Sequence, residues 1–206
     1  GYTLAPVASL REIVGEAAAA VASIAATASQ FGADPTRIVV AGHSAGAHLA
    51  ASLVTELAPG PTRDLVAGLL LVGGIYDLPP LAESYVNERV GMGAQEAVAL
   101  SPAALQPLRN VPVALRVGER EPSEFHRNAA LLFDRWAPSL TKVEVANVAN
   151  RDHFDVLEEL DNGGGVLFAE AVRLLGLGPS PSGTGDGPTA RGAAARGAAS
   201  GADVGG

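Results

Sequence analysis

The residues best suited to chemistry stand in the segment Ala41-Gly42-His43-Ser44-Ala45-Gly46, which contains the pattern Gly-x-Ser-x-Gly. The segment follows a short apolar run, Arg37 to Gly42, and precedes a stretch of helical character, Ala45 to Leu57. A serine on a sharp turn between a strand and a helix projects its Oγ above the edge of a sheet, as a nucleophile requires. The pattern therefore predicts Ser44 as a nucleophile, the alternative being a serine that only caps a helix.

The neighbours of this serine have expected roles as well. Gly42 and Gly46 should leave room for the strand and the helix to approach each other closely. The backbone N–H of Ala45, at the N-terminus of the helix, should face the oxyanion that develops when a carbonyl is attacked.

A serine nucleophile also needs a base and an acid that orients the base, which in this setting follow in the order serine, acid, histidine. Of the four histidines, His153 follows the fourth predicted strand in a loop, which is where the base belongs. A histidine in an ordinary surface loop is the alternative. His43 and His48 are too close to Ser44 in sequence to reach it from the far side, and His126 falls early in a predicted helix.

The acid should follow the third predicted strand. That stretch offers three carboxylates, Glu119, Glu121 and Glu124, and the residue types leave the choice open. Asp77 is less suitable because it follows the strand before, and Asp152 is badly placed to orient the imidazole next to it.

Apolar runs of strand length alternate with helical patterns along the chain. The predicted strands are Arg37 to Gly42, Val66 to Val72, Val111 to Val117 and Lys142 to Val148. The predicted helices are Leu10 to Gln30 with Gly32 as C-cap, Ala45 to Leu57, Glu124 to Trp136, and Phe154 to Leu175 broken at Gly163-Gly164-Gly165. Strands that are almost continuously apolar are typical of a parallel sheet covered by helices on both faces, so the predicted class is α/β. The stretch between Tyr76 and Pro112 has no strand pattern and is a natural wall for a ligand site.

The composition excludes several classes of protein. The 206 residues are 48% hydrophobic, with 22 acidic side chains against 14 basic ones, so a nucleic-acid partner is not expected. The absence of cysteine excludes disulfides, thiolate metal ligands and thiol catalysis. No membrane partner is expected, because Ala17 to Ala22 is too short to span a bilayer and its flanks carry Glu12 and Glu16.

The remaining expectations concern partners and domain boundaries. Neither a metal nor a cofactor is implied, the expected partner is a small-molecule substrate in the cytoplasm, and a homodimer is left open. The folded domain is predicted over residues 1–176. Residues 177–206, rich in Gly, Ala and Pro, are predicted to be a disordered tail.

Several segments, in order, resemble the α/β-hydrolase esterases that include kynurenine formamidase (arylformamidase). The segment Ala41 to Ala50 is similar to that family's nucleophile turn nearly residue for residue, and Asp152-His153-Phe154 matches its Asp-His-Phe. Further similar segments are Val72 to Leu78, Ser84 to Asn87, Leu100 to Pro102, and Val117-Gly118 followed by Glu124 to Arg127. The similarity runs from Tyr2 to about Leu160 and implies an α/β-hydrolase fold with about four parallel strands.

Carried over position by position, the resemblance implies Ser44 as nucleophile, His153 as base and Glu121 as acid, with Glu119 as the rival. Glu121 stands where the family usually has Asp, which requires a shifted loop. The family's His-Gly-Gly loop, which supplies the other oxyanion N–H groups, lies before the segment that matches Tyr2 to Pro6. The expectation is therefore an N-terminally truncated hydrolase domain, in which the strand before Ser44 becomes an exposed apolar edge.

The resemblance implies hydrolysis of N-formylkynurenine to kynurenine and formate, a step of tryptophan breakdown. A general carboxylesterase of small acyl esters fits the same motifs. Tyr76, Tyr85 and Asn87 are candidates for lining the substrate pocket, with core packing as the equal alternative. A function of a different class is a truncated, non-catalytic hydrolase-like domain.

Overall fold

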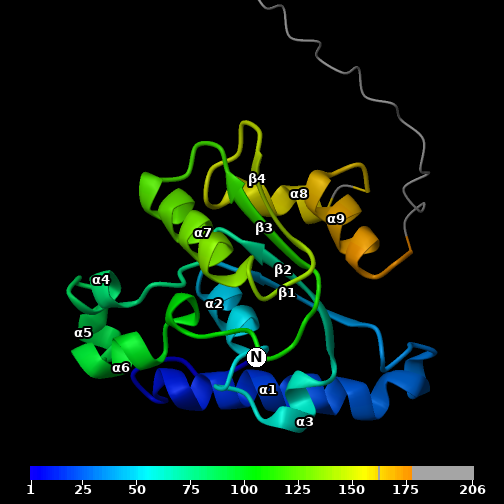
Figure 1. The fold of residues 1–206 in the computed structure, drawn as a ribbon, viewed down its shortest axis with the longest axis horizontal. Coiled ribbons are helices and arrows are strands. Elements are labelled where there is room, and N and C mark those ends of the chain that lie inside the picture. Colours follow the sequence, from blue (N-terminus) through cyan, green and yellow to red (C-terminus); the bar gives the residue numbers. More distant parts are fainter. Residues whose placement is uncertain (162, 178–206) are drawn as a thin grey trace, which may run out of the picture.

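The computed structural model describes residues 1–161 and 163–177, which form a parallel sheet between two layers of helices (Figure 1). The strands are β1 (Ile38–His43), β2 (Val66–Val72), β3 (Val113–Gly118) and β4 (Val143–Val148). The longer helices are α1 (Leu10–Thr27), α2 (Ala45–Ser52), α7 (Ser123–Trp136) and α9 (Val166–Leu174). The shorter elements are η1 (Ala28–Phe31), α3 (Gly60–Arg63), α4 (Pro79–Ala82), α5 (Asn87–Val90), α6 (Ala94–Ala99), η2 (Pro102–Ala104), η3 (Asp155–Leu157) and α8 (Glu158–Asp161). The predicted disordered tail lies outside the described residues, apart from Leu177.

All four strands run parallel in the order β1-β2-β3-β4. The register is continuous across the centre, where Leu70 of β2 pairs with Ala41 of β1 and with Ala114 of β3. The carboxyl ends of the strands therefore meet at one edge of the sheet, where the loops after β1, β3 and β4 come together. Within the described residues β1 is an edge strand, and most of its side chains are half-buried.

Alternate residues of the sheet serve two separate cores, which confirms the prediction of parallel strands covered on both faces. Leu69 and Leu71 of β2 face a large cluster with the buried sides of α1, α2 and α7, including Trp136. Leu70 and Val72 face the opposite cluster, which α9 closes with Leu167. Burying a side chain of this size stabilises the folded state by about 1.5–3 kcal/mol, so the two clusters hold the sheet between its helices.

The helix α1 begins with a capping box, in which Ser9 and Glu12 bond each other's backbone N–H groups. The left-handed Gly32 (φ 70°) ends the following turn, as predicted. The segment Leu10–Phe31, with a mean hydropathy of 1.2, is long and apolar enough to cross a membrane by length and composition, which corrects the sequence-based exclusion of any such stretch. One such helix is weak evidence for a membrane, and Val14 and Ala18 of α1 are buried within the fold.

The helix α2 is shorter than predicted, ending at Ser52 rather than Leu57. The Ser52 hydroxyl donates to the His48 carbonyl and the Thr55 hydroxyl donates to the Ser52 carbonyl. Such side chains compete with the helical ladder of hydrogen bonds, which explains the early end of the helix.

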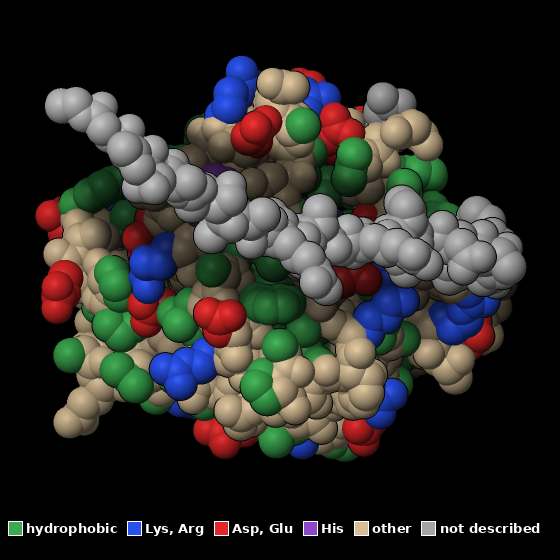
Figure 2. All heavy atoms as spheres, turned by 45° about the horizontal axis from the view of Figure 1, so that its top comes forward, with side chains coloured by type: hydrophobic (Ala, Val, Ile, Leu, Met, Phe, Trp, Pro, Cys, Tyr) green, Lys and Arg blue, Asp and Glu red, His purple; other side chains and the backbone are tan. Residues whose placement is uncertain are grey.

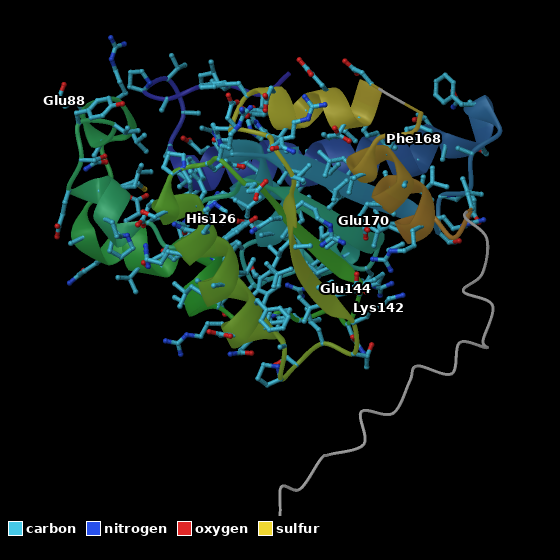
Figure 3. All side chains as sticks on the ribbon, turned by 90° about the horizontal axis from the view of Figure 1, so that it is seen from above. Glu88, His126, Lys142, Glu144, Phe168 and Glu170 are labelled. Atoms are coloured by element: carbon cyan, nitrogen blue, oxygen red, sulfur yellow. The ribbon has the colours of Figure 1, made fainter. Side chains whose placement is uncertain are left out.

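A buried arginine connects the helix α9 with the strands β3 and β4. Arg116 of β3 is 2.9 Å from a carboxylate oxygen of Glu170 on α9 and 3.5 Å from one of Glu144 on β4. Figure 3 labels both carboxylates on their elements. Because a buried charge is tolerated when it is paired, these ion pairs fix α9 against β3 and β4.

The stretch between β2 and β3 has no strand in the described structure, as the pattern predicts. It folds into the short helices α4, α5 and α6, which the sequence analysis does not predict. On the face seen in Figure 2, acidic and basic side chains are interspersed with hydrophobic ones.

Candidate active site

Ser44 occupies a strained turn between β1 and α2. Its backbone has φ 56° and ψ −121°, and a positive φ at a residue other than glycine is costly. The turn is held in place because the Ser44 N–H donates to the Val72 carbonyl of the neighbouring strand over 2.9 Å. The hydroxyl is thereby fixed above the carboxyl end of the sheet.

The two glycines of the motif have different environments. A Cβ on Gly42 would lie 2.2 Å from the Gly46 carbonyl oxygen, so only glycine permits this approach of strand and helix. A Cβ on Gly46 would meet no atom of the described residues within 4 Å, so the expectation that Gly46 is needed for close packing is wrong.

The structure brings Ser44, His153 and Glu121 together in a chain of hydrogen bonds. His153 Nδ1 lies 2.7 Å from Glu121 Oε2, and His153 Nε2 lies 3.0 Å from Ser44 Oγ. A carboxylate only accepts, so the imidazole carries its proton on Nδ1 and its Nε2 is free to accept from the serine hydroxyl. This is the arrangement of groups that generates a serine nucleophile in hydrolases.

Glu121 is the carboxylate that the structure places against the imidazole. Its side chain is fully buried, and its Oε1 accepts the Gly118 N–H over 2.8 Å. Its rival, Glu119, is exposed and accepts the Asn150 N–H over 2.8 Å. The other carboxylates are also engaged elsewhere. Glu124 and Asp77 both pair with the Arg127 guanidinium. Asp152 accepts backbone N–H groups of its own loop, which lower its pKa.

The loop that carries His153 is fixed on the side facing α8. The Arg151 carbonyl accepts the Arg120 N–H over 2.8 Å, and the Arg151 guanidinium bonds Glu158 and Glu159 at 2.7 Å each. These bonds tie the position of His153 to the loop after β3, which carries Glu121.

Ala45 is the first residue of α2 and is exposed. The first N–H groups of a helix have no partner within the helix, and the helix dipole adds partial positive charge there. Ala45 therefore presents a donor beside the Ser44 hydroxyl, where a carbonyl oxygen would become negative.

An apolar pocket of about 350 Å³ opens beside Ser44 and Ala45. Its walls come from the first residues of the chain, from α1, and from the segment between β2 and β3; they include Leu4, Leu10, Ile13, Leu78, Val90 and Met92. No Asp, Glu, Lys or Arg side chain is among its described lining residues, so the pocket suits an uncharged apolar group.

The three predicted pocket residues do not line it, and this expectation is corrected. Tyr76 is fully buried in the main core, where burial raises the pKa of its phenol. Tyr85 is 81% exposed. The Asn87 side chain instead donates to the Ala82 and Met92 carbonyls, so it braces the wall from outside the pocket.

Sequence reasoning missed two rings that contact the base. The Phe125 ring stacks on the His153 imidazole with centroids 4.2 Å apart, and the His43 ring lies 4.5 Å away at a tilt of 39°. Only the place of His43 beside the serine could have drawn attention to it. In the described part of the chain no group of three or more His, Cys, Asp or Glu side chains is arranged to hold a metal ion.

Comparison with known proteins defines the class of this chain. A model of the alpha/beta hydrolase fold family matches residues 1–153. The chain therefore belongs to the α/β-hydrolase family, in agreement with the parallel sheet and with the strand–serine–helix turn.

Two curated relatives are kynurenine formamidases of fish. The enzyme of Salmo salar is 30% identical over 183 residues, which cover 85% of this chain and 61% of that protein. The enzyme of Danio rerio is 28% identical over 182 residues, with the same coverage. The chain thus spans about three fifths of the length of these relatives.

Solved structures with the same fold are esterases and related proteins. A candidate thioesterase from Silicibacter sp. TM1040 superposes with a TM-score of 0.72 at 29% identity, over 82% of this chain and 61% of that one. The thermophilic carboxylesterase EstE1, from a metagenomic library, superposes with a TM-score of 0.66 at 24% identity, over 86% and 68% of the two chains.

Proposed function

We propose that this chain is a serine hydrolase that cleaves a formamide or a carboxylic ester. The observation that carries the proposal is the pair of hydrogen bonds at 3.0 and 2.7 Å that joins Ser44 to His153 and His153 to Glu121. The relationship to the fish kynurenine formamidases supports an aryl formamide such as N-formylkynurenine as substrate. The partner is then a small molecule, and a cytoplasmic location remains a prediction.

Each group has a defined step in this mechanism. Ser44 Oγ attacks the carbonyl carbon while its proton passes to His153 Nε2, and Glu121 stabilises the imidazolium through Nδ1–H. The negative oxygen of the tetrahedral intermediate accepts the Ala45 N–H. The intermediate collapses when His153 delivers the proton to the leaving amine or alcohol. Water then attacks the acyl-serine with the same imidazole as base, which releases the acid and restores Ser44.

The apolar pocket favours a second candidate, a carboxylesterase of small acyl esters. A volume of about 350 Å³ beside Ser44 is much larger than a formyl group needs, and the described lining has no formal charge to recognise an amino acid. In a formamidase the pocket would hold the aryl body of the substrate, whereas in an esterase it would hold an aliphatic acyl chain.

The test is labelling with a fluorophosphonate, which phosphonylates an activated serine, followed by intact-mass measurement. We expect one adduct on the wild-type chain, none on Ser44→Ala, and one on Ser23→Ala, which changes an exposed serine of α1. A folded wild-type chain that takes no adduct would overturn the proposal in favour of a non-catalytic domain. Rates with N-formylkynurenine and with p-nitrophenyl esters then decide between the two substrate classes.

A further inference from the structure

We infer that His43, the residue before the nucleophile, is a positioning residue that holds the base over Ser44. The inference rests on the proposed function and adds to it a residue outside the Ser44–His153–Glu121 chain. Its basis is one hydrogen bond: His43 Nε2 lies 2.7 Å from the backbone carbonyl oxygen of His153.

The direction of this bond fixes the state of the His43 ring. A carbonyl oxygen can only accept, so His43 must carry a proton on Nε2 and donate it. Burial, together with the nearby His153, lowers the pKa of His43, so the ring is neutral at neutral pH. A neutral donor is what the site requires, because a second positive ring would oppose the imidazolium that His153 becomes during the reaction.

The bond connects the end of β1, which leads into Ser44, with the loop that carries His153, and the distance between these two segments controls the proton transfer. His43 is the last residue of β1, and Ser44 follows it directly, so a contact from His43 to the His153 carbonyl ties the backbone of the base to the strand of the nucleophile. Other anchors of the base loop, through Asn150 and Arg151, reach the loop after β3 and the helix α8. Without His43, the side of the loop nearest Ser44 loses its direct link to β1.

The rings add to the effect of the hydrogen bond. The His153 imidazole contacts His43 at 4.5 Å and Phe125 at 4.2 Å, so it is held against rings from β1 and from α7. Such contacts restrict the imidazole to the orientation in which Nε2 faces Ser44 Oγ over 3.0 Å. A misplacement of about 1 Å in a reacting group can lower a rate by about 10²-fold.

The experiment compares His43→Leu, which removes the donor, with His43→Gln, which retains an N–H at similar reach. The matched control is His126→Leu on α7 (Figure 3), a histidine outside the Ser44–His153–Glu121 chain of hydrogen bonds. With a p-nitrophenyl ester we expect His43→Leu to lower kcat roughly tenfold to a hundredfold with KM little changed. His43→Gln should recover most of kcat, and the control should match wild type.

A second readout does not depend on activity. The Nδ1–H of His153, bonded to the buried Glu121, should give a low-field proton resonance in NMR spectra of the wild-type chain. We expect this resonance to broaden in His43→Leu and to return in His43→Gln, with unchanged thermal unfolding in all variants.

The inference is overturned if His43→Leu keeps the wild-type kcat and resonance, or if His43→Gln is as impaired as His43→Leu. If the wild-type chain neither hydrolyses esters nor takes the fluorophosphonate, the proposed function fails. The NMR comparison then still decides whether His43 positions His153.

Discussion

The loops that carry Ser44, Glu121 and His153 differ from the pocket wall between β2 and β3 in what holds them. The loops are fixed by directional bonds, including the bond from the Ser44 N–H to β2 and that from the Gly118 N–H to Glu121. The wall is braced by hydrogen bonds of the Asn87 side chain, but it packs on the rest of the fold through a small apolar cluster, Leu78, Met92, Ala97 and Leu100. Hydrogen bonds fix distances to tenths of an ångström, whereas aliphatic contacts tolerate changes of shape, so proton transfer and substrate accommodation fall to different parts of the molecule.

The largest effect should come from breaking the hydrogen-bonded region at its buried carboxylate. Glu121→Ala removes the group that holds the imidazole tautomer, and we expect kcat to fall by about 10³–10⁴-fold. Glu119→Ala, two residues away and exposed, is the matched comparison: it removes only the bond to the Asn150 N–H, so its kcat should fall far less. Ester hydrolysis by the purified variants provides the measurement. Equal losses in the two variants would contradict the assignment of the acid.

The next effect tests the strained turn. A Cβ on Gly42 would lie 2.2 Å from the Gly46 carbonyl oxygen, so Gly42→Ala must displace the turn between β1 and α2 that carries Ser44. We expect a loss of about 1–3 kcal/mol in the free energy of unfolding, together with reduced fluorophosphonate labelling.

Gly15→Ala on α1 is the control for that variant, since a Cβ there meets no described atom within 4 Å. It should stabilise the chain by about 0.5–1 kcal/mol because alanine is the better helix former. Urea unfolding measures both. A Gly42→Ala variant as stable and as reactive as wild type would show that the turn is not strained in this way.

A substitution in the apolar wall should change the selectivity between substrates rather than the reactivity of Ser44. Val90→Phe adds bulk to a residue that lines the pocket, so kcat/KM for a p-nitrophenyl hexanoate should fall roughly tenfold relative to the acetate. The rate of fluorophosphonate labelling should stay unchanged. Val98→Phe, on the exposed side of α6, should alter neither the ratio of kcat/KM for the two esters nor the rate of fluorophosphonate labelling. Equal losses for both esters would mean that the pocket does not receive the acyl chain.

The smallest effect concerns a buried hydrogen bond between α2, which follows Ser44, and the pocket wall between β2 and β3. His48 of α2 donates from Nε2 to the Leu100 carbonyl over 2.8 Å, and burial lowers its pKa below the usual 6.5. The unfolded chain then binds a proton that the folded chain does not, so stability falls as the pH drops below about 6.5 and the loss is complete below the folded pKa.

His48→Gln keeps a donor but removes the titration, so the unfolding free energy should depend less on pH below 6.5 than in wild type. Urea unfolding at a series of pH values is the measurement, with His126→Leu as the control. An unchanged pH dependence would exclude His48 as the group responsible.

Much of the fold could be predicted because its signals are local. The predicted strands agree with β1 to β4 to within two residues at each end, since apolar runs bounded by turn residues persist in the folded chain. The end of α2 was missed because the hydroxyls of Ser52 and Thr55 compete with the helix, which composition alone does not reveal. The prediction that Tyr76 and Tyr85 line the pocket is wrong for a different reason. Both are aromatic residues of one segment, and only the packing of the fold determines that Tyr76 is buried in the core while Tyr85 is exposed to solvent.

The sequence by itself determined the α/β alternation, the turn at Ser44 and the order serine, acid, histidine, because each depends on neighbouring residues and on chain direction. The residue types left Glu119 and Glu121 open and only the family resemblance favoured Glu121; the tertiary structure decided that Glu121 faces His153 and that His43 bonds the carbonyl of the base. Both decisions depend on how loops from three different strands meet at one edge of the sheet. Contacts between residues more than a hundred positions apart, such as His43 and His153, are set by strand order and register rather than by local spacing.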